Sequence, residues 1–146
     1  MAKAILKPRR QVAALAVRSD EAGRIRVLLM TSRQTKRPVA PKGWPMKNLP
    51  DHRAAEIEAR QEAGVVGRVH RKPIGEYEYW KRLDDRFELC RVKVFLLEVE
   101  SQLNTWDEHG QREIGWFDLE EAVNLVDDPG MGAIIRELPE RLKRAS

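Results

Sequence analysis

Apolar and polar positions near the start of the chain predict two strands joined by a turn. Residues 12–17 form an apolar run, residues 20–23 carry turn-forming side chains, and residues 25–30 are again mostly apolar. The next stretch, 34–50, holds four prolines and a glycine, which forbids a long helix. We therefore expect a hairpin followed by a loop with at most a short strand around Val39.

The clearest helical pattern covers residues 51–63. This stretch is rich in helix formers, Asp51 suits the N-cap position, and Gly64 stands where a helix usually stops. One face of the predicted helix carries a stripe of small residues: Ala55, Ala59 and Ala63. A helix with such a stripe packs closely on a sheet, so we expect it to cover one.

Three further strands are predicted after this helix, over residues 65–69, 74–80 and 87–99. In the last of them, alternate positions are apolar on one face: Cys90, Val92, Val94 and Leu96. The opposite face begins with Arg91 and Lys93. This alternation is typical of a strand with one face in the core.

The remainder of the chain predicts a loop, a short strand and two helices. The loop covers 105–110, the strand Trp116 and Phe117, and the first helix 119–126, beginning after Asp118. The sequence DDPG at 127–130 ends that helix, and a last helix is expected over 132–144. Strands and helices in this order predict one α/β (α+β) domain with a mixed sheet, spanning residues 1–146.

Composition narrows the class of protein. Of the 146 residues, 42% are hydrophobic and 34% charged, which argues against a disordered chain. No apolar run approaches the roughly 20 residues that span a bilayer, so no membrane partner is expected. The single cysteine, Cys90, excludes an internal disulfide and a multi-cysteine zinc site. These features favour a cytoplasmic protein, and they leave open whether it is a monomer or a homodimer.

The basic residues indicate an anionic partner. The net charge is +4, and lysines and arginines cluster at the start, in the proline-rich stretch and at the end. Such clusters attract nucleic acid, anionic membranes or small phosphorylated molecules, or they simply form a solvated surface. Because the aromatics do not alternate with basic residues, nucleic acid is not the expected partner. The three histidines have no metal-ligand spacing and are expected at the surface: His52, His70 and His109.

Two carboxylates on the predicted helix carry the candidate chemistry. Glu58 and Glu62 are four residues apart and share a helical face, with Gln61 close to it. Like charges at this spacing repel, and a divalent cation would turn that repulsion into attraction. The alternative is an ordinary solvated helix face.

The sequence around this helix resembles the signature of the Nudix hydrolases. That signature reads Gly, five residues, Glu, seven residues, then R-E-U-x-E-E-x-G-U, where U is bulky and apolar. Five positions match at the right separations: Gly43, Glu58, Glu62, Gly64 and Val65. Four depart from it: Leu49 for the first Glu, Ile57 for Arg, Ala59 for the bulky residue and Gln61 for Glu.

Segments outside the signature are similar to the diphosphoinositol polyphosphate phosphohydrolase branch of that family. They are RRQVAALAVRS, LLMTSR, the P-x-G entry at 41–43, EAGVVG, VFLLEV and REIGWFDLEEAVNLV, and they follow in the expected order. The resemblance implies an α/β/α sandwich around a mixed β-sheet. It also implies Mg²⁺- or Mn²⁺-dependent hydrolysis of a diphosphate linkage in a small phosphorylated substrate, such as a diphosphoinositol polyphosphate, dinucleoside polyphosphate or nucleoside diphosphate derivative.

The same resemblance assigns residues to roles. Glu58 and Glu62 would bind the metal together with backbone near Lys42 or Gly43, where a glycine lets the loop pass close. Substrate phosphates would contact positions in several regions: Arg9, Arg10 and Gln11; Thr31, Ser32 and Arg33; and, less closely matched, Arg112 together with Lys81 and Arg82 in a loop after the strand predicted over 74–80.

Gln61 is the most consequential departure, because in the family this position holds a metal ligand or the catalytic base. An amide does not accept a proton at neutral pH. Either another carboxylate (Glu76, Glu78 or Glu108) or a metal-bound hydroxide serves as base, or the domain is a weak or inactive hydrolase that binds a phosphorylated ligand. For a dinucleoside or capped-RNA substrate, Trp44 or Tyr79 would stack on a base.

Overall fold

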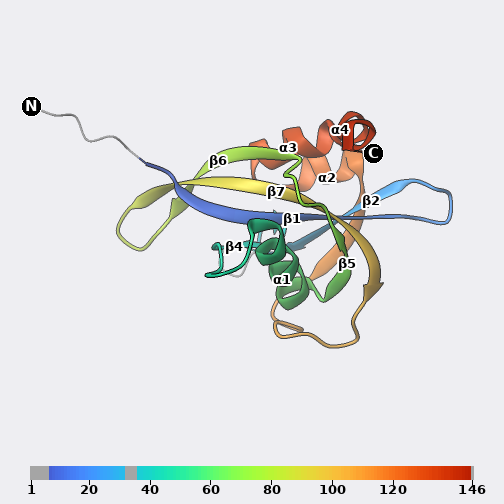
Figure 1. Cartoon of the computed structure of the whole chain (residues 1–146), viewed down its shortest axis with the longest axis horizontal. Helices are drawn as coiled ribbons and strands as arrows, with labels where there is room; N and C mark the ends of the chain where they lie inside the picture. Colours follow the sequence, from blue (N-terminus) through green and yellow to red (C-terminus); the bar gives the residue numbers. More distant parts are fainter. Residues whose placement is uncertain (1–6, 32–35, 146) are drawn as a thin grey trace, which may run out of the picture.

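The computed structural model describes residues 7–31 and 36–145 and contains a mixed eight-stranded sheet with helices on both faces (Figure 1). Helix α1 lies on one face, and α2, α3 and α4 lie on the other. The elements are β1 (Arg9–Ser19), β2 (Ile25–Thr31), β3 (Pro38–Val39), β4 (Lys42–Gly43), α1 (Asp51–Ala63), β5 (Val65–Val69), β6 (Gly75–Arg82), β7 (Phe87–Gln102), β8 (Ile114–Asp118), α2 (Leu119–Leu125), α3 (Pro129–Arg136) and α4 (Leu138–Ala145). The predicted α/β/α sandwich is confirmed.

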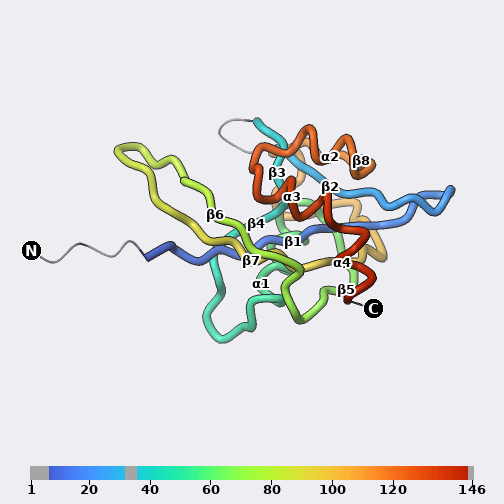
Figure 2. Tube along the Cα trace, turned by 90° about the horizontal axis from the view of Figure 1, so that it is seen from above, coloured from blue at the N-terminus to red at the C-terminus, as the bar shows by residue number. Residues whose placement is uncertain are grey.

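The centre of the sheet is the parallel pair β1 and β7, which run side by side through the molecule (Figure 2). Strand order is β3-β2-β1-β7-β5, while β4 pairs with β1, β6 with β7 and β8 with β2. The predicted hairpin is present, because β1 and β2 pair antiparallel with Val17 opposite Val27. Residues 11–17 are buried without interruption, as expected for a central strand covered on both faces.

The core has two layers, one on each face of the sheet. On the α1 face, Phe95 and Leu97 pack with the alanine stripe, whose three members are fully buried. On the other face, Leu15 and Leu96 pack against Ile135 and Leu138 of α3 and α4. The predicted apolar face of β7 is confirmed, and beyond Lys93 its opposite face is buried too because α1 covers it.

Several boundaries differ from the predictions. Lys81 and Arg82 lie inside β6, which pairs with β7 up to its last residue, instead of in a loop. The single helix predicted over 132–144 is two helices, α3 and α4. Helix α3 begins at Pro129, within the predicted breaker, because proline suits the first helical position.

Two other expectations also need correction. Pro50 occupies the N-cap of α1, and Asp51 is the first helical residue. His52 is buried, with its ring 6.5 Å from that of Phe95, because it faces the sheet from the first turn of α1. His70 is partly buried against Glu98, whereas His109 is exposed as predicted. Among the described residues, no helix is long and apolar enough to cross a membrane.

Candidate functional site

Strand β4 brings its backbone against the two signature glutamates of α1. It pairs antiparallel with β1, Val12 lying opposite Gly43. The Lys42 N–H donates a hydrogen bond to Oε2 of Glu62 (3.0 Å). A Cβ at Gly43 would lie 2.3 Å from Oε1 of Glu58, so that carboxylate occupies the space of a side chain. The structure therefore brings Glu58 and Glu62 together against β4, and both line one cavity.

A third carboxylate and a buried arginine complete the charged cluster. Arg112 donates from Nε to Oε1 of Glu108 (3.2 Å), and its Nη2 lies 3.5 Å from Oε1 of Glu62. The Arg112 side chain is only 12% exposed and that of Glu62 only 6%. The Glu108 N–H donates to the carbonyl of Gln61 (3.0 Å), which fixes the loop before β8 on the end of α1.

Burial and repulsion between neighbouring carboxylates raise the pKa values of Glu58 and Glu62. Burial raises the pKa of Glu62 to about 8, with Arg112 opposing the shift and Glu58 and Glu108 adding to it. The pKa of Glu58 is raised as well, first by burial and then by the negative charge of Glu108. A bound cation would stabilise the ionised form of both carboxylates.

The donor set fits a hard divalent cation. Carboxylate oxygens are the ligands that Mg²⁺ prefers, and it commonly takes one or two of them together with water and substrate phosphates. In the described parts of the chain, no three His, Cys, Asp or Glu side chains are grouped closely enough to hold a metal ion by themselves. A cation held by Glu58 and Glu62 would have room for backbone oxygens near Lys42 and Gly43, water and substrate phosphate as its other ligands.

These residues line a cavity of about 720 Å³ between β4, α1, β6 and the loop before β8. Its walls carry cationic side chains: Arg37, Lys42, Lys81, Arg82 and Arg112. Its aromatic lining residues are Trp44, Tyr79 and Trp80, and its acidic ones are Glu58, Glu62, Glu108, Asp127 and Asp128. The cavity thus carries both carboxylates and cationic side chains on its walls, which suits a metal-bound phosphorylated ligand.

Polar contacts fix one wall of the cavity. Lys42 Nζ lies 3.4 Å from Oδ2 of Asp128 and 4.3 Å from the centre of the Tyr79 ring. The Tyr79 hydroxyl donates to Oε1 of Gln11 (2.6 Å). Because Lys42 covers the ring and Gln11 binds the hydroxyl, Tyr79 is a supporting residue in this arrangement. Trp80 is 56% exposed and leaves ring surface open to a ligand.

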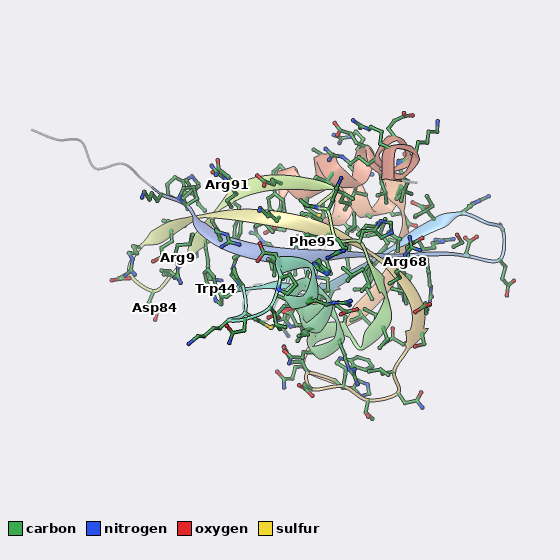
Figure 3. The ribbon with its side chains drawn as sticks, viewed as in Figure 1. Arg9, Trp44, Arg68, Asp84, Arg91 and Phe95 are labelled. Atoms are coloured by element: carbon green, nitrogen blue, oxygen red, sulfur yellow. The ribbon has the colours of Figure 1, made fainter. Side chains whose placement is uncertain are left out.

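The predicted phosphate contacts divide into two groups. Gln11, Lys81, Arg82 and Arg112 line the cavity. Arg9 and Arg10 do not: Arg9 pairs with Glu88 (3.0 Å), and Arg10 pairs with Asp51 (2.6 Å). Arg9 also lies over the ring of Trp44 (4.2 Å), and Figure 3 shows the two residues on the same side of the molecule.

The other predicted site residues lie apart from the cavity or beyond the described chain. The Thr31 hydroxyl accepts a hydrogen bond from the Glu113 N–H (3.1 Å). Gln61 is partly buried and does not line the cavity. Ser32 and Arg33 lie outside the described residues. Of the three candidate bases, only Glu108 lines the cavity, whereas Glu78 pairs with Arg91 (3.0 Å).

The sequence did not single out Asp127, Asp128 or Trp80 as site residues. The two aspartates were interpreted only as a helix breaker, and Trp80 only as a strand residue. Asp128 accepts from both Lys42 and Tyr77 (3.3 Å to the Tyr77 hydroxyl), two partners far away in sequence. Only the fold brings these partners together, so no local pattern indicated them.

Comparisons with known proteins agree with this geometry. Residues 9–138 match the NUDIX domain family. Nudix hydrolase 16, mitochondrial, of Arabidopsis thaliana is 35% identical over 118 residues, covering 77% of this chain and 65% of the relative. Nudix hydrolase 13, mitochondrial, of the same plant is 30% identical over 125 residues, covering 81% and 61%. The chain thus spans slightly less than two thirds of the length of these relatives.

Solved structures share the fold at low sequence identity. The binary complex of C. elegans Ap4A hydrolase aligns with a TM-score of 0.68 at 20% identity, covering 92% of this chain and 97% of that one. The NUDIX domain of Shewanella oneidensis NrtR, complexed with ADP ribose, aligns with a TM-score of 0.70 at 12% identity, covering 94% and 90%. With the signature glutamates meeting on one cavity and the family matching nearly the whole chain, this protein belongs to the Nudix domain family.

Proposed function

We propose that this domain is a divalent-cation-dependent hydrolase of a diphosphate linkage in a small, highly phosphorylated molecule. The observation that carries the proposal is the convergence of three carboxylates, Glu58, Glu62 and Glu108, with cationic side chains on one cavity. The two Arabidopsis relatives described above are named Nudix hydrolases, which supports the same activity. Because the chain covers only part of those relatives, the activity is inferred from its own cavity.

Glu58 and Glu62 are the proposed metal ligands. When bound, Mg²⁺ or Mn²⁺ would neutralise phosphate charge and lower the pKa of a coordinated water. The protein contributes a fixed position for the cation, because the Lys42 N–H orients Glu62 and the absent Cβ of Gly43 leaves room for Glu58. Burial of Glu62 also strengthens its electrostatic attraction for the cation.

Glu108 is the proposed general base in place of Gln61. It is the one candidate among Glu76, Glu78 and Glu108 that lines the cavity, and Arg112 holds one of its oxygens. The Glu108 carboxylate would accept the proton of the attacking water, which Gln61 is chemically unable to do. The backbone N–H of Glu108 donates to the backbone carbonyl of Gln61, so residue 61 helps to position the proposed base.

Lys81, Arg82 and Arg112 are the proposed phosphate contacts. Lys81 and Arg82 end β6 at one side of the cavity, and Arg112 lies beside the carboxylates. Guanidinium groups bind phosphate through two parallel hydrogen bonds, so the two arginines would fix the orientation of the substrate. Arg9, Arg10 and Thr31 remain possible contacts only if a bound substrate extends beyond the cavity.

The substrate class follows from both charge and aromatic surface. Two structural neighbours are named for Ap4A and ADP ribose, and the open ring of Trp80 would suit a base. The cationic lining equally suits a diphosphoinositol polyphosphate, the substrate of the branch that the sequence resembles. We propose the feature that these substrates share: a phosphoanhydride flanked by further phosphate or sugar groups. We also propose that the enzyme acts in the cytoplasm.

A phosphate-release screen tests this proposal. The purified protein would be assayed with nucleoside, dinucleoside and inositol diphosphates in Mg²⁺, in Mn²⁺ and in chelator. Metal-dependent turnover of one class supports the proposal. The second candidate, a domain that binds a phosphorylated ligand without turnover, rests on Gln61; it predicts saturable ligand binding in calorimetry with no product released.

A further inference from the structure

A second cavity of about 770 Å³ lies apart from the candidate active site and shares none of its lining residues. Six of its ten lining residues are Arg or Lys, and none is Asp or Glu. The six are Arg53, Arg68, Arg71, Lys72, Arg141 and Arg144. Figure 3 places Arg68 of this cavity toward the opposite end of the sheet from Trp44, which lines the first cavity.

The fold assembles this cavity at an edge of the sheet from both helical layers. Arg53 comes from the first turn of α1 on one face, and Arg141 and Arg144 come from α4 on the other. Arg68 lies on the edge strand β5, and the turn between β5 and β6 contributes Arg71 and Lys72. Segments far apart in the sequence therefore direct cationic residues to one concave surface.

Backbone hydrogen bonds make the turn a fixed wall of this cavity. The His70 N–H donates to the Leu96 carbonyl (2.9 Å), and the Ile74 N–H donates to the Val94 carbonyl (2.8 Å). The Arg141 guanidinium donates to the Ile74 carbonyl and is also held by Glu137 (2.6 Å). Hydrogen bonds to β7 and α4 thus fix the backbone of the turn that carries Arg71 and Lys72.

Local acidic residues balance only part of the positive charge. Glu56 pairs with Arg53 (2.9 Å), Glu98 with Arg68 (3.4 Å), and Glu137 with Arg141. Across residues 7–31 and 36–145, no side-chain hydrogen bond or ion pair engages Arg71, Lys72 or Arg144. Within the described chain these three cations therefore lack an acidic partner, and their mutual repulsion carries a cost that a bound anion would relieve.

We propose that this cavity binds a compact polyphosphate anion at a site separate from the catalytic one. Arginine forks match phosphate oxygens, and the volume falls in the range of small-molecule sites, roughly 300–1,000 Å³. An extended nucleic acid fits less well. The cations surround a concavity instead of following a stripe, and none of the ten lining residues is Phe, Tyr or Trp for base stacking.

Binding of inorganic tripolyphosphate tests this site without depending on catalysis. Calorimetry in chelator would compare the wild type with the variant Arg71→Ala/Lys72→Ala/Arg144→Ala, which removes no hydrogen bond or ion pair among the described residues. The matched control, Arg24→Ala/Lys47→Ala/Arg136→Ala, loses the same charge at exposed positions outside both cavities. We expect roughly tenfold or greater weakening in the first variant and less than twofold change in the control.

Amide chemical shifts locate the bound anion. Tripolyphosphate should shift the resonances of residues 69–74 and of α4, and added salt should reverse the shifts. Equal tripolyphosphate affinity in the wild type and in Arg71→Ala/Lys72→Ala/Arg144→Ala, or equal weakening in the control, would overturn the proposal. Loss of binding in Lys81→Ala/Arg82→Ala alone would also overturn it, because the anion would then occupy the catalytic cavity.

A short single-stranded RNA provides the remaining comparison. If RNA binds through Arg71, Lys72 and Arg144 while tripolyphosphate does not bind, the ligand is an extended polyanion and the compact-ligand proposal is wrong. Because none of these measurements requires turnover, failure of the proposed hydrolase activity would leave the result of this test unchanged.

Discussion

The backbone N–H of Lys42 donates to Oε2 of Glu62 over 3.0 Å, joining a two-residue strand to a helix twenty positions later in the chain. This bond holds a carboxylate that is 5% exposed in an environment that raises its pKa to about 8. A group held in this way binds either a proton or a cation. Its titration therefore reports directly on metal binding.

Metal affinity should increase with pH through the titration of Glu62. Below about pH 8 a divalent cation must displace a proton from this carboxyl, so Mn²⁺ affinity should rise between about pH 6 and about pH 8 and then level off. Calorimetry in buffers of different ionisation enthalpy would count the released protons. We expect close to one at neutral pH, and an affinity independent of pH would contradict this assignment.

Glu62 should also make the metal-free protein less stable as pH rises. The ordinary pKa of 4.5 applies in the unfolded chain, so between that value and about 8 the folded state holds the extra proton. The free energy of unfolding therefore falls with increasing pH across this window. Glu62→Gln should remove this pH dependence of the free energy of unfolding. Above about pH 8 the variant should lose less stability, relative to its own value at low pH, than the wild type does, by on the order of 1–3 kcal/mol. Urea unfolding at several pH values measures it.

Gly43→Ala should impair the site far more than the fold. The new Cβ would meet Oε1 of Glu58 at 2.3 Å, and a flexible carboxylate yields more easily than backbone. We expect a roughly 10²-fold loss of kcat/KM with a melting temperature lowered by only a few degrees. Gly132→Ala is the control, since its nearest neighbour lies at 3.5 Å and both properties should stay near wild type.

Glu108→Gln should reduce kcat by roughly 10²–10⁴-fold with little change in KM, because a base acts in the transition state. Glu113→Gln, five residues later and exposed, is the matched control. The sequence predicts that Gln61→Glu raises kcat, whereas a base at Glu108 predicts a change of only a few-fold. Steady-state kinetics of the three variants distinguish a base at Glu108 from a base at position 61. A large increase of kcat in Gln61→Glu would show that a carboxylate at position 61 is the better base and would contradict the role of Glu108.

Lys81→Ala/Arg82→Ala should raise KM by roughly tenfold or more while kcat changes little, because both residues line the cavity as proposed phosphate contacts. Arg10→Ala should have a smaller effect, since Arg10 lies outside the cavity and pairs with Asp51. Comparing KM on the same substrate tests this ranking. If Arg10→Ala raised KM more than Lys81→Ala/Arg82→Ala does, the ranking would be wrong and the substrate would lie against the start of β1.

The elements that the sequence predicted well are those with local causes. The hairpin of β1 and β2 follows from two apolar runs around a turn, and α1 follows from helix formers ending at Gly64, which has the left-handed φ of 68°. The pairing of Glu58 and Glu62 depends only on helical periodicity. Helix α3 was mispredicted because Pro129 was interpreted as a breaker, although proline begins helices readily.

The features that the sequence did not predict depend on distant partners. The sequence offered Glu108 as one of three candidate bases but gave no reason to choose it: it reaches the cavity because its loop is fastened to the end of α1, where Trp106 also lies 2.2 Å from the Cβ position of Gly64. Arg9 faces Glu88, a partner 79 residues away that the parallel pairing of β1 and β7 brings near. Neither distance is encoded in a local pattern, so charge clusters in the sequence did not reveal which arginines line the cavity.

The most direct test of the account is a parallel measurement of Mn²⁺ binding and turnover in Glu58→Gln/Glu62→Gln. Both substitutions preserve side-chain volume, and Glu56→Gln on the same helix is the control. We expect the double variant to fold, to lose Mn²⁺ binding by electron paramagnetic resonance, and to lose roughly 10³-fold or more in kcat on the best substrate of the screen. A folded double variant that still binds Mn²⁺ and turns over within a few-fold of wild type would contradict a catalytic metal site at these two carboxylates.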